Sequence, residues 1–295
     1  TLPGGVTSIG GIAFCECSSL TSIEIPSSVT TIEDDAFYGC DKLVIICEKD
    51  SYAYSFAKGK KIPVKIAEKV KRPAGKGTTF TITKNNIKVK VTSTGTSNPT
   101  VAVTKIANSS AKKVTIPASV TVDGVVYKVT KIADNAFKGN KKLTTVTIGS
   151  NVTSIGKNAF SGCTALAKAT IGKNVTTIGD KAFYKCTKLA SITIPDKVKK
   201  IGNSTFYGCT SLKKATIGKC VTSIGKNAFY GCKKLKTITI KSSKIKTIGK
   251  NAFKSINKKA TITLKGTKKA NKALKKKLKK SSVGYVKTWK IKSVS

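Results

Sequence analysis

A repeat of 23 residues is the feature that most constrains how this chain of 295 residues can fold. The stretch from Leu189 to Cys209 reads LASITIPDKVKKIGNSTFYGC, and close copies of it stand on both sides. A fixed period of this length predicts a solenoid of stacked coils. Phenylalanines mark the period, each 23 residues after the last except for the final step of 24, and an earlier pair repeats it: Phe137, Phe160, Phe183, Phe206, Phe229 and Phe253, then Phe14 and Phe37.

One such unit is too small to bury its own apolar positions, so each position becomes a column along the stack. The alternation in L-x-x-I-x-I predicts a short strand, and strands of adjacent coils then pair as a parallel sheet about 4.8 Å apart. Glycines recur one residue after an Ile column, at Gly156, Gly179, Gly202 and Gly225, and we expect a turn with positive φ there. The inward columns are Leu166, Leu189, Leu212 and Leu235; Ile148, Ile171, Ile194, Ile217 and Ile240; Val152, Val175, Val198 and Val221; Ile155, Ile178, Ile201 and Ile224.

The words IPSSVTTIEDDAFYGCDKL, IGSNVTSIGKNAFSGCTAL and IPDKVKKIGNSTFYGCTSL carry a family resemblance. They resemble the BspA-like, or Treponema pallidum type, subfamily of leucine-rich repeats. The resemblance implies a mainly β protein with short helices, a right-handed solenoid with parallel strands on its concave face. It also implies a secreted or surface-attached bacterial protein, often an adhesin, with a binding role and no reaction.

Breaks in the repeat predict two capped modules. Residues 1–68 form a short leucine-rich-repeat module whose end cap is a helix over Ser51–Ala57 and a strand over Ile62–Ile66. Residues 69–77 have the Lys, Pro and Gly content of a linker. Residues 78–128 hold two hairpin signals, at Asn85-Asn86 and Asp123-Gly124, and we expect an antiparallel N-terminal cap there.

The main solenoid follows at residues 129–264, and residues 265–295 form its C-terminal cap. Ala270, Ala273, Leu274 and Leu278 fall on one face of a helix that is otherwise Lys-rich. The alternation of Val283, Tyr285, Trp289 and Ile291 then predicts a last strand. The chain opens inside a repeat and contains no Met, which we interpret as a mature or excised fragment.

The net charge of +43 is unevenly distributed. Residues 1–57 carry a net charge of −6 and residues 58–295 one of +49, with no acid after Asp196. Such asymmetry suggests an anionic partner for the later part, although a lysine-rich surface that keeps a solenoid soluble is the simpler interpretation. Arg72 is the single Arg, which argues against specific recognition of nucleic acid through bidentate contacts.

The chain is not predicted to be an enzyme, and no cofactor is expected. It contains no His, so the usual general base, the Ser-His and Cys-His pairs and most zinc sites are missing. The carboxylates of residues 78–295 lie in different repeats or turns: Asp123, Asp134, Asp180 and Asp196. No apolar run is long enough to span a membrane.

Six of the nine cysteines stand three residues after a repeat Phe: Cys17, Cys40, Cys163, Cys186, Cys209 and Cys232. Asn140 and Ile256 occupy the equivalent position in other repeats. A position that accepts Cys, Ile or Asn indicates a small, inward packing site, so we favour a ladder of buried free thiols. Disulfides are the alternative, because a secreted location permits them, and metal binding by stacked thiols is a weaker one.

A partner is expected on the exposed strand positions. Ten residues after each Phe of the main array comes a threonine, and the first module has Glu24 and Cys47 there. The threonine column with its flanking lysines offers a polar, mildly basic face, although Thr is also simply common in strands. The candidate binding residues are Thr147, Thr170, Thr193, Thr216, Thr239, Lys168, Lys214 and Lys236.

Three functions remain open from the sequence. The first is adhesion through weak, multivalent contact with a host or microbial surface protein or a glycan. The second is a structural spacer with no ligand of its own. The third is electrostatic binding to anionic wall polymers or to nucleic acid, which salt would weaken steeply. The predicted location is secreted or at the cell surface.

Overall fold

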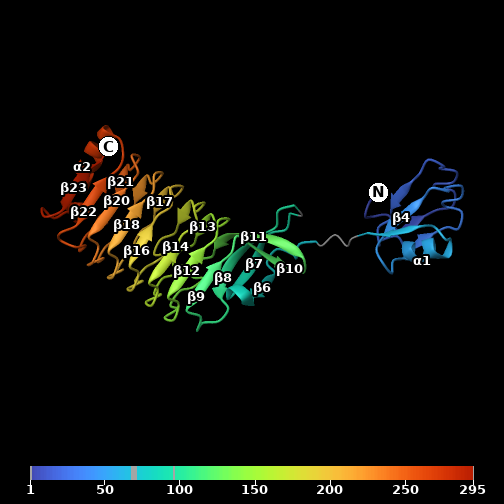
Figure 1. Ribbon diagram of the computed structural model, residues 1–295, viewed down its shortest axis with the longest axis horizontal. Coiled ribbons are helices and arrows are strands. Elements are labelled where there is room, and N and C mark those ends of the chain that lie inside the picture. The colour runs from blue at the N-terminus through green and yellow to red at the C-terminus, as the bar shows by residue number, and fades with distance from the viewer. Residues whose placement is uncertain (1, 68–71, 96, 295) are drawn as a thin grey trace. The chain divides into compact units, whose positions relative to one another are not determined.

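The structure is a computed structural model that describes residues 2–67, 72–95 and 97–294. The chain divides into two compact units, Thr1–Lys71 and Arg72–Ser295, and each has a hydrophobic core of its own. Figure 1 shows stacked strands in both units. Within the described residues, no helix is long and apolar enough to cross a membrane.

The first unit holds two coils and an end cap. β1 (Ser8–Ile9) pairs in parallel with β3 (Thr31–Ile32), and β2 (Ser22–Glu24), β4 (Val44–Cys47) and β5 (Val64–Ile66) form a second parallel sheet. The predicted helix and strand of the cap are confirmed as α1 (Tyr52–Gly59) and β5. The Ser51 hydroxyl starts the helix by accepting a hydrogen bond from the backbone N–H of Tyr54.

The second unit begins with β6 (Thr79–Ile82), the short helix η1 (Thr83–Asn85), β7 (Ile87–Ser93) and β8 (Thr100–Ile106). β9 (Lys113–Ile116), β10 (Ser119–Val122) and β11 (Val125–Ile132) follow. Both predicted hairpins are confirmed, β6–β7 and β10–β11, and Asp123 and Gly124 have the positive φ of 50° and 75° that the second turn requires.

The prediction of an antiparallel cap was wrong in part, because β8 is antiparallel to β7 but has a parallel strand on its other side, and β9 has no antiparallel partner among the described residues. β8 pairs in parallel with β11, and β9 in parallel with β12 (Thr145–Ile148). Val114 and Ile116 stand opposite Val146 and Ile148. The parallel strand that belongs to the repeat is therefore already present at β9, before the first Phe of the main array. Residues 68–71 of the predicted linker lie outside the described residues. From Ala74 on, the chain is bound to this unit, because the Ala74 N–H donates to the Tyr127 hydroxyl at 2.7 Å.

Two sheets run along the stack, one parallel throughout and one parallel from β8 onward (Figure 1). The long-strand sheet is ordered β9, β12, β14 (Lys168–Thr170), β16 (Ser191–Thr193), β18 (Lys214–Ile217), β20 (Thr237–Ile240), β22 (Thr261–Leu264) and β23 (Lys290–Ser293). The short-strand sheet continues β6, β7, β8 and β11 with β13 (Ser154–Ile155), β15 (Thr177–Ile178), β17 (Lys200–Ile201), β19 (Ser223–Ile224) and β21 (Thr247–Ile248), while β10 pairs on β11. Sequence reasoning predicted only the first sheet, because two-residue strands leave no alternation to detect.

The core consists of the predicted columns. The Leu, Val and Ile columns are buried, except that Ile171 is only partly so. Phenylalanine rings from Phe137 to Phe253 stack face to face, with centroids 4.9 to 5.5 Å apart and interplanar angles of 3° to 15°. Each ring therefore buries its faces against the coils before and after it, which a single unit could not do.

The explanation predicted for the glycine column was wrong. Gly156, Gly179, Gly202 and Gly225 do not have positive φ. A Cβ at Gly202 would lie 2.5 Å from the Asp180 Oδ1 atom and 2.8 Å from the Asp180 N atom of the preceding coil. Glycine is needed there because neighbouring coils approach too closely for a side chain.

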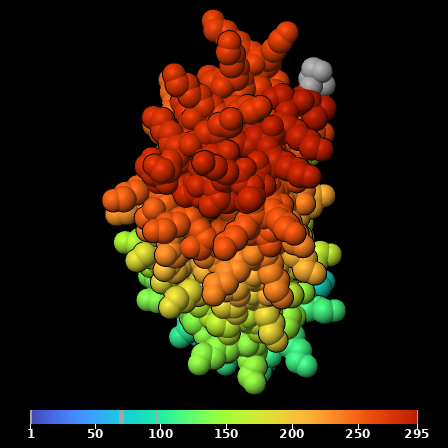
Figure 2. Space-filling view, turned by 90° about the vertical axis from the view of Figure 1, so that its left-hand side faces the viewer, coloured from blue at the N-terminus to red at the C-terminus, as the bar shows by residue number. Residues whose placement is uncertain are grey.

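The last coil is closed by α2 (Lys268–Leu278), η2 (Ser281–Val283) and β23. Leu274 and Leu278 are buried as the helical pattern predicts, and so is Asn271, whose side chain bonds to the backbone of Leu264 and Gly266. The final strand is shorter than predicted, because Gly284 turns with φ of 97° and only Lys290–Ser293 pairs with β22. Figure 2 looks onto this end, where residues from the last part of the chain, in red, form the surface.

Candidate functional site

The five predicted threonines lie at equivalent positions of successive long strands. Thr147 pairs with Thr170, and Thr216 pairs with both Thr193 and Thr239. The column continues beyond the predicted residues, to Thr115 at one end and Thr263 at the other. Neighbouring strand residues such as Ile192 point into the core, so the pleat turns each threonine outward.

A second outward column lies two residues earlier on each strand. It alternates lysines with small hydroxyl residues over most of its length: Lys113, Thr145, Lys168, Ser191, Lys214, Thr237, Thr261 and Lys290. Lys168 and Lys214 belong to it, and because one strand separates them their backbones are about 10 Å apart. We call the threonine and lysine columns together the long-strand face.

Lys236 is not part of either column. It precedes β20, and its backbone N–H donates to the Lys213 carbonyl at 3.1 Å, whereas Thr237 is the residue that pairs with Lys214. The step of 23 residues from Lys214 leads to Thr237, so the prediction of Lys236 was one residue out of register. In the first unit the step between strands is one residue shorter, so Glu24 pairs with Ile46, while Cys47 is buried in the core.

Chemically, the long-strand face offers hydroxyl groups, which donate and accept hydrogen bonds, and ammonium groups, which attract anions. It contains no carboxylate and no aromatic ring. The part of the chain that the structure describes holds no group of three or more metal-ligating side chains. This arrangement suits contact with a long, polar partner along the stack.

Sequence reasoning missed a tyrosine ladder. Tyr184, Tyr207 and Tyr230 are half-buried and stack with ring centroids 5.0 Å apart. The Nζ atoms of Lys181 and Lys185 lie 5.9 and 5.5 Å from the centroid of the first ring. Three successive Phe-Tyr pairs were the signal in the sequence. Because the rings cover one another, they leave mainly edges and hydroxyls to a partner.

The cysteine ladder is confirmed in the second unit as a column of buried free thiols. Each Sγ atom lies 3.0 to 3.2 Å from the carbonyl oxygen of the Phe one coil earlier, for Cys163, Cys186, Cys209 and Cys232. Burial raises the pKa of the Cys163 and Cys232 thiols to about 12. These thiols therefore stay protonated, which makes them poor nucleophiles and metal ligands. In the first unit Cys17 is exposed, so the ladder is not buried there.

The comparisons with known proteins agree with this geometry. A model of the BspA type leucine rich repeat region matches the chain in six copies, over residues 1–71, 100–216, 130–259 and 176–281. The second of these ranges begins before the Phe period, as the pairing of β9 with β12 does. No curated protein matches the chain.

Several solved structures are similar. A leucine rich repeat protein of T. pallidum, TpLRR, has a TM-score of 0.50 and 22% identity, covering 75% of this chain and 99% of that one. The pneumococcal vaccine antigen PcpA has a TM-score of 0.53 and 25% identity, covering 67% and 52%. A leucine rich cell surface protein of Faecalibacterium prausnitzii has 31% identity and a TM-score of 0.47, covering 66% and 56%. The chain thus spans about half the length of the last two.

Proposed function

Because this chain belongs to the BspA-type leucine-rich-repeat family, we propose that it is a bacterial surface protein whose long-strand face binds an extended protein or glycan. The observation that carries the proposal is the register of the two outward columns, which places a threonine on each successive coil beside a lysine or a small hydroxyl residue. A partner that is itself long and repetitive can meet several coils at once.

We propose that each contact is weak and that affinity comes from their number. The face has no Trp, Tyr or Arg, the residues that dominate the binding energy of most protein interfaces. Hydroxyl and lysine contacts each contribute little when solvent-exposed. Several of them on one rigid stack raise the affinity through effective concentration.

We propose a location outside the cell, secreted or at the cell surface. The similarity to a pneumococcal vaccine antigen, at 25% identity, supports this. So does the family resemblance of the repeat words in the sequence.

Binding without catalysis is the proposed activity, since the carboxylates of the main array already have structural roles. Asp134 accepts the Lys157 N–H at 2.9 Å, Asp180 accepts the Asn203 N–H at 2.7 Å, and Asp196 accepts the Lys219 N–H at 3.1 Å. In each case a carboxylate of one coil binds the backbone of the next.

The test compares two double variants of the whole chain. Thr170→Glu with Thr193→Glu alters the long-strand face, and Thr153→Glu with Thr177→Glu is the matched control beside the short-strand sheet, where both residues are also exposed. Each protein is screened against immobilised matrix glycoproteins and glycans at low and at moderate salt. We expect the first variant to lose binding at least about tenfold and the control to keep it.

Equal losses in both variants would remove the long-strand face as the site. Failure of the unaltered protein to bind any probe would favour the spacer function instead. Thermal unfolding followed by the fluorescence of Trp289 checks that both variants are folded.

A further inference from the structure

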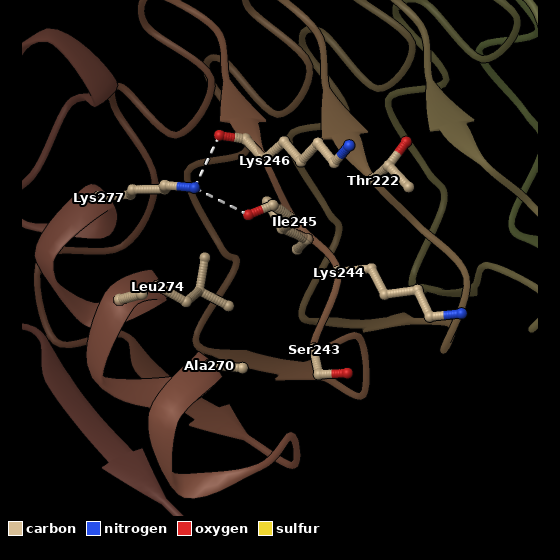
Figure 3. Close-up of a pocket in the computed structure, with 9 residues that line it drawn as sticks. Thr222, Ser243, Lys244, Ile245, Lys246, Ala270, Leu274 and Lys277 are labelled. Carbon is tan, nitrogen blue, oxygen red and sulfur yellow. Dashed lines mark hydrogen bonds between the residues drawn. The ribbon is translucent and has the colours of Figure 1, made fainter.

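A groove runs between α2 and the turns of the two coils before it. It consists of two hollows of about 560 and about 720 Å³ that share Ser243 and Lys244 in their linings. Figure 3 shows the first hollow, with Ala270 and Leu274 of α2 on one side and Lys244 and Thr222 on the other. We call the two hollows together the α2 groove.

Lysine is the commonest residue in the lining. The second hollow alone is lined by Lys219, Lys241, Lys244, Lys265 and Lys268, and the first adds Lys246 and Lys277. The sequence has no acid after Asp196, and the Oδ1 atom of Asp196 is engaged by the Lys219 N–H at 3.1 Å. Several like charges in one hollow repel each other, and a bound polyanion would relieve that repulsion.

Lys277 differs from the other lysines of the groove because its ammonium group already forms hydrogen bonds within the protein. Its Nζ atom donates to the carbonyl oxygens of Ile245 at 3.0 Å and Lys246 at 2.7 Å, as Figure 3 shows, and this holds α2 on the stack. The ammonium groups of the other six form no hydrogen bond or ion pair with any residue that the structure describes. The ion pair between Lys60 and Asp34 belongs to the first unit.

The rest of the lining narrows the choice of polyanion. It contains no aromatic ring and no Arg, so nucleobases and sugar rings find no surface on which to stack. Lysines act as point charges that suit phosphate oxygens, and Thr222, Ser243 and Thr267 add hydroxyl groups. Ala270, Ala273 and Leu274 form a small apolar wall for methylene groups.

We propose that the α2 groove binds a linear phosphodiester polymer of a ring-free polyol, with phosphates on the lysines and the polyol along α2. This surface is separate from the long-strand face, since none of the residues lining the groove belongs to either outward column. The inference therefore does not rest on the function proposed above.

Poly(glycerol phosphate) is the probe, with heparin and a single-stranded DNA oligonucleotide as competing polyanions. The groove variant carries Lys219→Gln, Lys244→Gln and Lys265→Gln. Its control carries Lys84→Gln, Lys88→Gln and Lys105→Gln on the N-terminal cap, where all three are exposed and the same charge is removed. Affinities are measured by calorimetry at about 50 and about 150 mM salt.

We expect the groove variant to bind poly(glycerol phosphate) at least about tenfold more weakly and with a smaller salt dependence, and the control to stay within about twofold. The long-strand variant Thr170→Glu with Thr193→Glu should bind this polymer as the unaltered protein does. Equal losses in the groove variant and its control would overturn the proposal, because net charge alone would then explain binding. Tighter, groove-dependent binding of heparin or DNA, or no binding of the probe, would also overturn it. Unfolding followed by Trp289 fluorescence shows whether each variant is folded.

Discussion

The two units use the same repeat but bury it to different extents. In the second unit Phe183 and Phe206 are fully buried, whereas in the first unit Phe37 is 7% exposed and Phe14 only half-buried. The ring geometry is nevertheless the same, since Phe14 and Phe37 stack with centroids 5.2 Å apart. The difference teaches that burial is set by the position of a coil in the stack, because only an inner coil has a neighbour on both sides.

The contacts between neighbouring coils also differ between the two units. In the second unit the residue four before Phe206 is Gly202, because the coils touch there. In the second coil of the first unit this position holds Glu33, whose Oε2 atom accepts the Gly11 N–H at 2.8 Å. The first unit thus admits an acidic side chain between coils where the second admits none.

The largest effect is expected from removing a ring of the inner stack. Phe206→Ala should destabilise its coils by about 3–5 kcal/mol, because the cavity would be closed in by coils on both sides. Phe14→Ala should cost less than about 2 kcal/mol, since that ring has a neighbour on one side. Hydrogen exchange of the amides in each unit measures both effects on the whole chain. Equal costs would show that position in the stack does not set burial energy.

Two equivalent glycines, Gly202 and Gly10, test whether the contact between coils differs between the two units. Gly202→Ala should cost about 1–3 kcal/mol or more, because its Cβ would overlap backbone atoms of the preceding coil. Gly10→Ala changes the equivalent residue of the first coil, where a Cβ would meet nothing within 4 Å, and should be neutral or slightly stabilising. Thermal unfolding by Trp289 fluorescence reports the first change and hydrogen exchange the second. A destabilised Gly10→Ala protein would point to a backbone requirement and not to coil contact.

The periodic part of the fold could be predicted from the sequence, and the contacts between coils could not. Phe, Leu and Val columns follow from the period, because every coil repeats the same environment. The role of Gly202 depends on the distance between backbones, which no residue pattern reports. Cys47 shows the same limit in the first unit, since a step of 22 residues puts Ile46 opposite Glu24 and leaves Cys47 in the core. The α2 groove joins residues up to 58 positions apart, from Lys219 to Lys277, and the α2 residues of its lining stand outside the repeat.

The end caps give a third contrast. Lys277→Met should lower the stability of the second unit by about 1–3 kcal/mol, because the carbonyls of Ile245 and Lys246 would lose a charged donor. Lys60→Met removes the ion pair with Asp34, whose Nζ–Oδ1 distance is 3.0 Å, and should cost less than about 1 kcal/mol because the carboxylate is 89% exposed. Urea unfolding of both variants at low and high salt measures the difference. A salt-sensitive loss for Lys277→Met would mean that it acts as a surface charge.

At neutral pH, the smallest effect on stability is expected from replacing the buried thiols. This effect becomes larger at alkaline pH. Burial raises the pKa of Cys163 and Cys232 to about 12 from an ordinary value of 9.0, so the folded chain holds these protons more tightly than the unfolded chain. The stability they contribute is therefore complete below about pH 9 and is lost as the pH rises toward 12. In the first unit, burial raises the pKa of Cys40 as well, but this thiol is only partly buried.

Replacing both Cys163 and Cys232 by Ala should make the free energy of unfolding fall less steeply between about pH 9 and about pH 11 than it does in the unaltered protein. Urea unfolding under reducing conditions measures this slope, and the comparison of the two proteins removes the contribution of titrating lysines and tyrosines. Cys40→Ala is the matched change in the first unit and should leave the slope for the second unit, followed by Trp289, unaltered. An identical slope in the unaltered protein and the double variant would show that ionised thiols are tolerated inside the stack. The burial of thiols would then cause no difference between the two units in the pH dependence of stability.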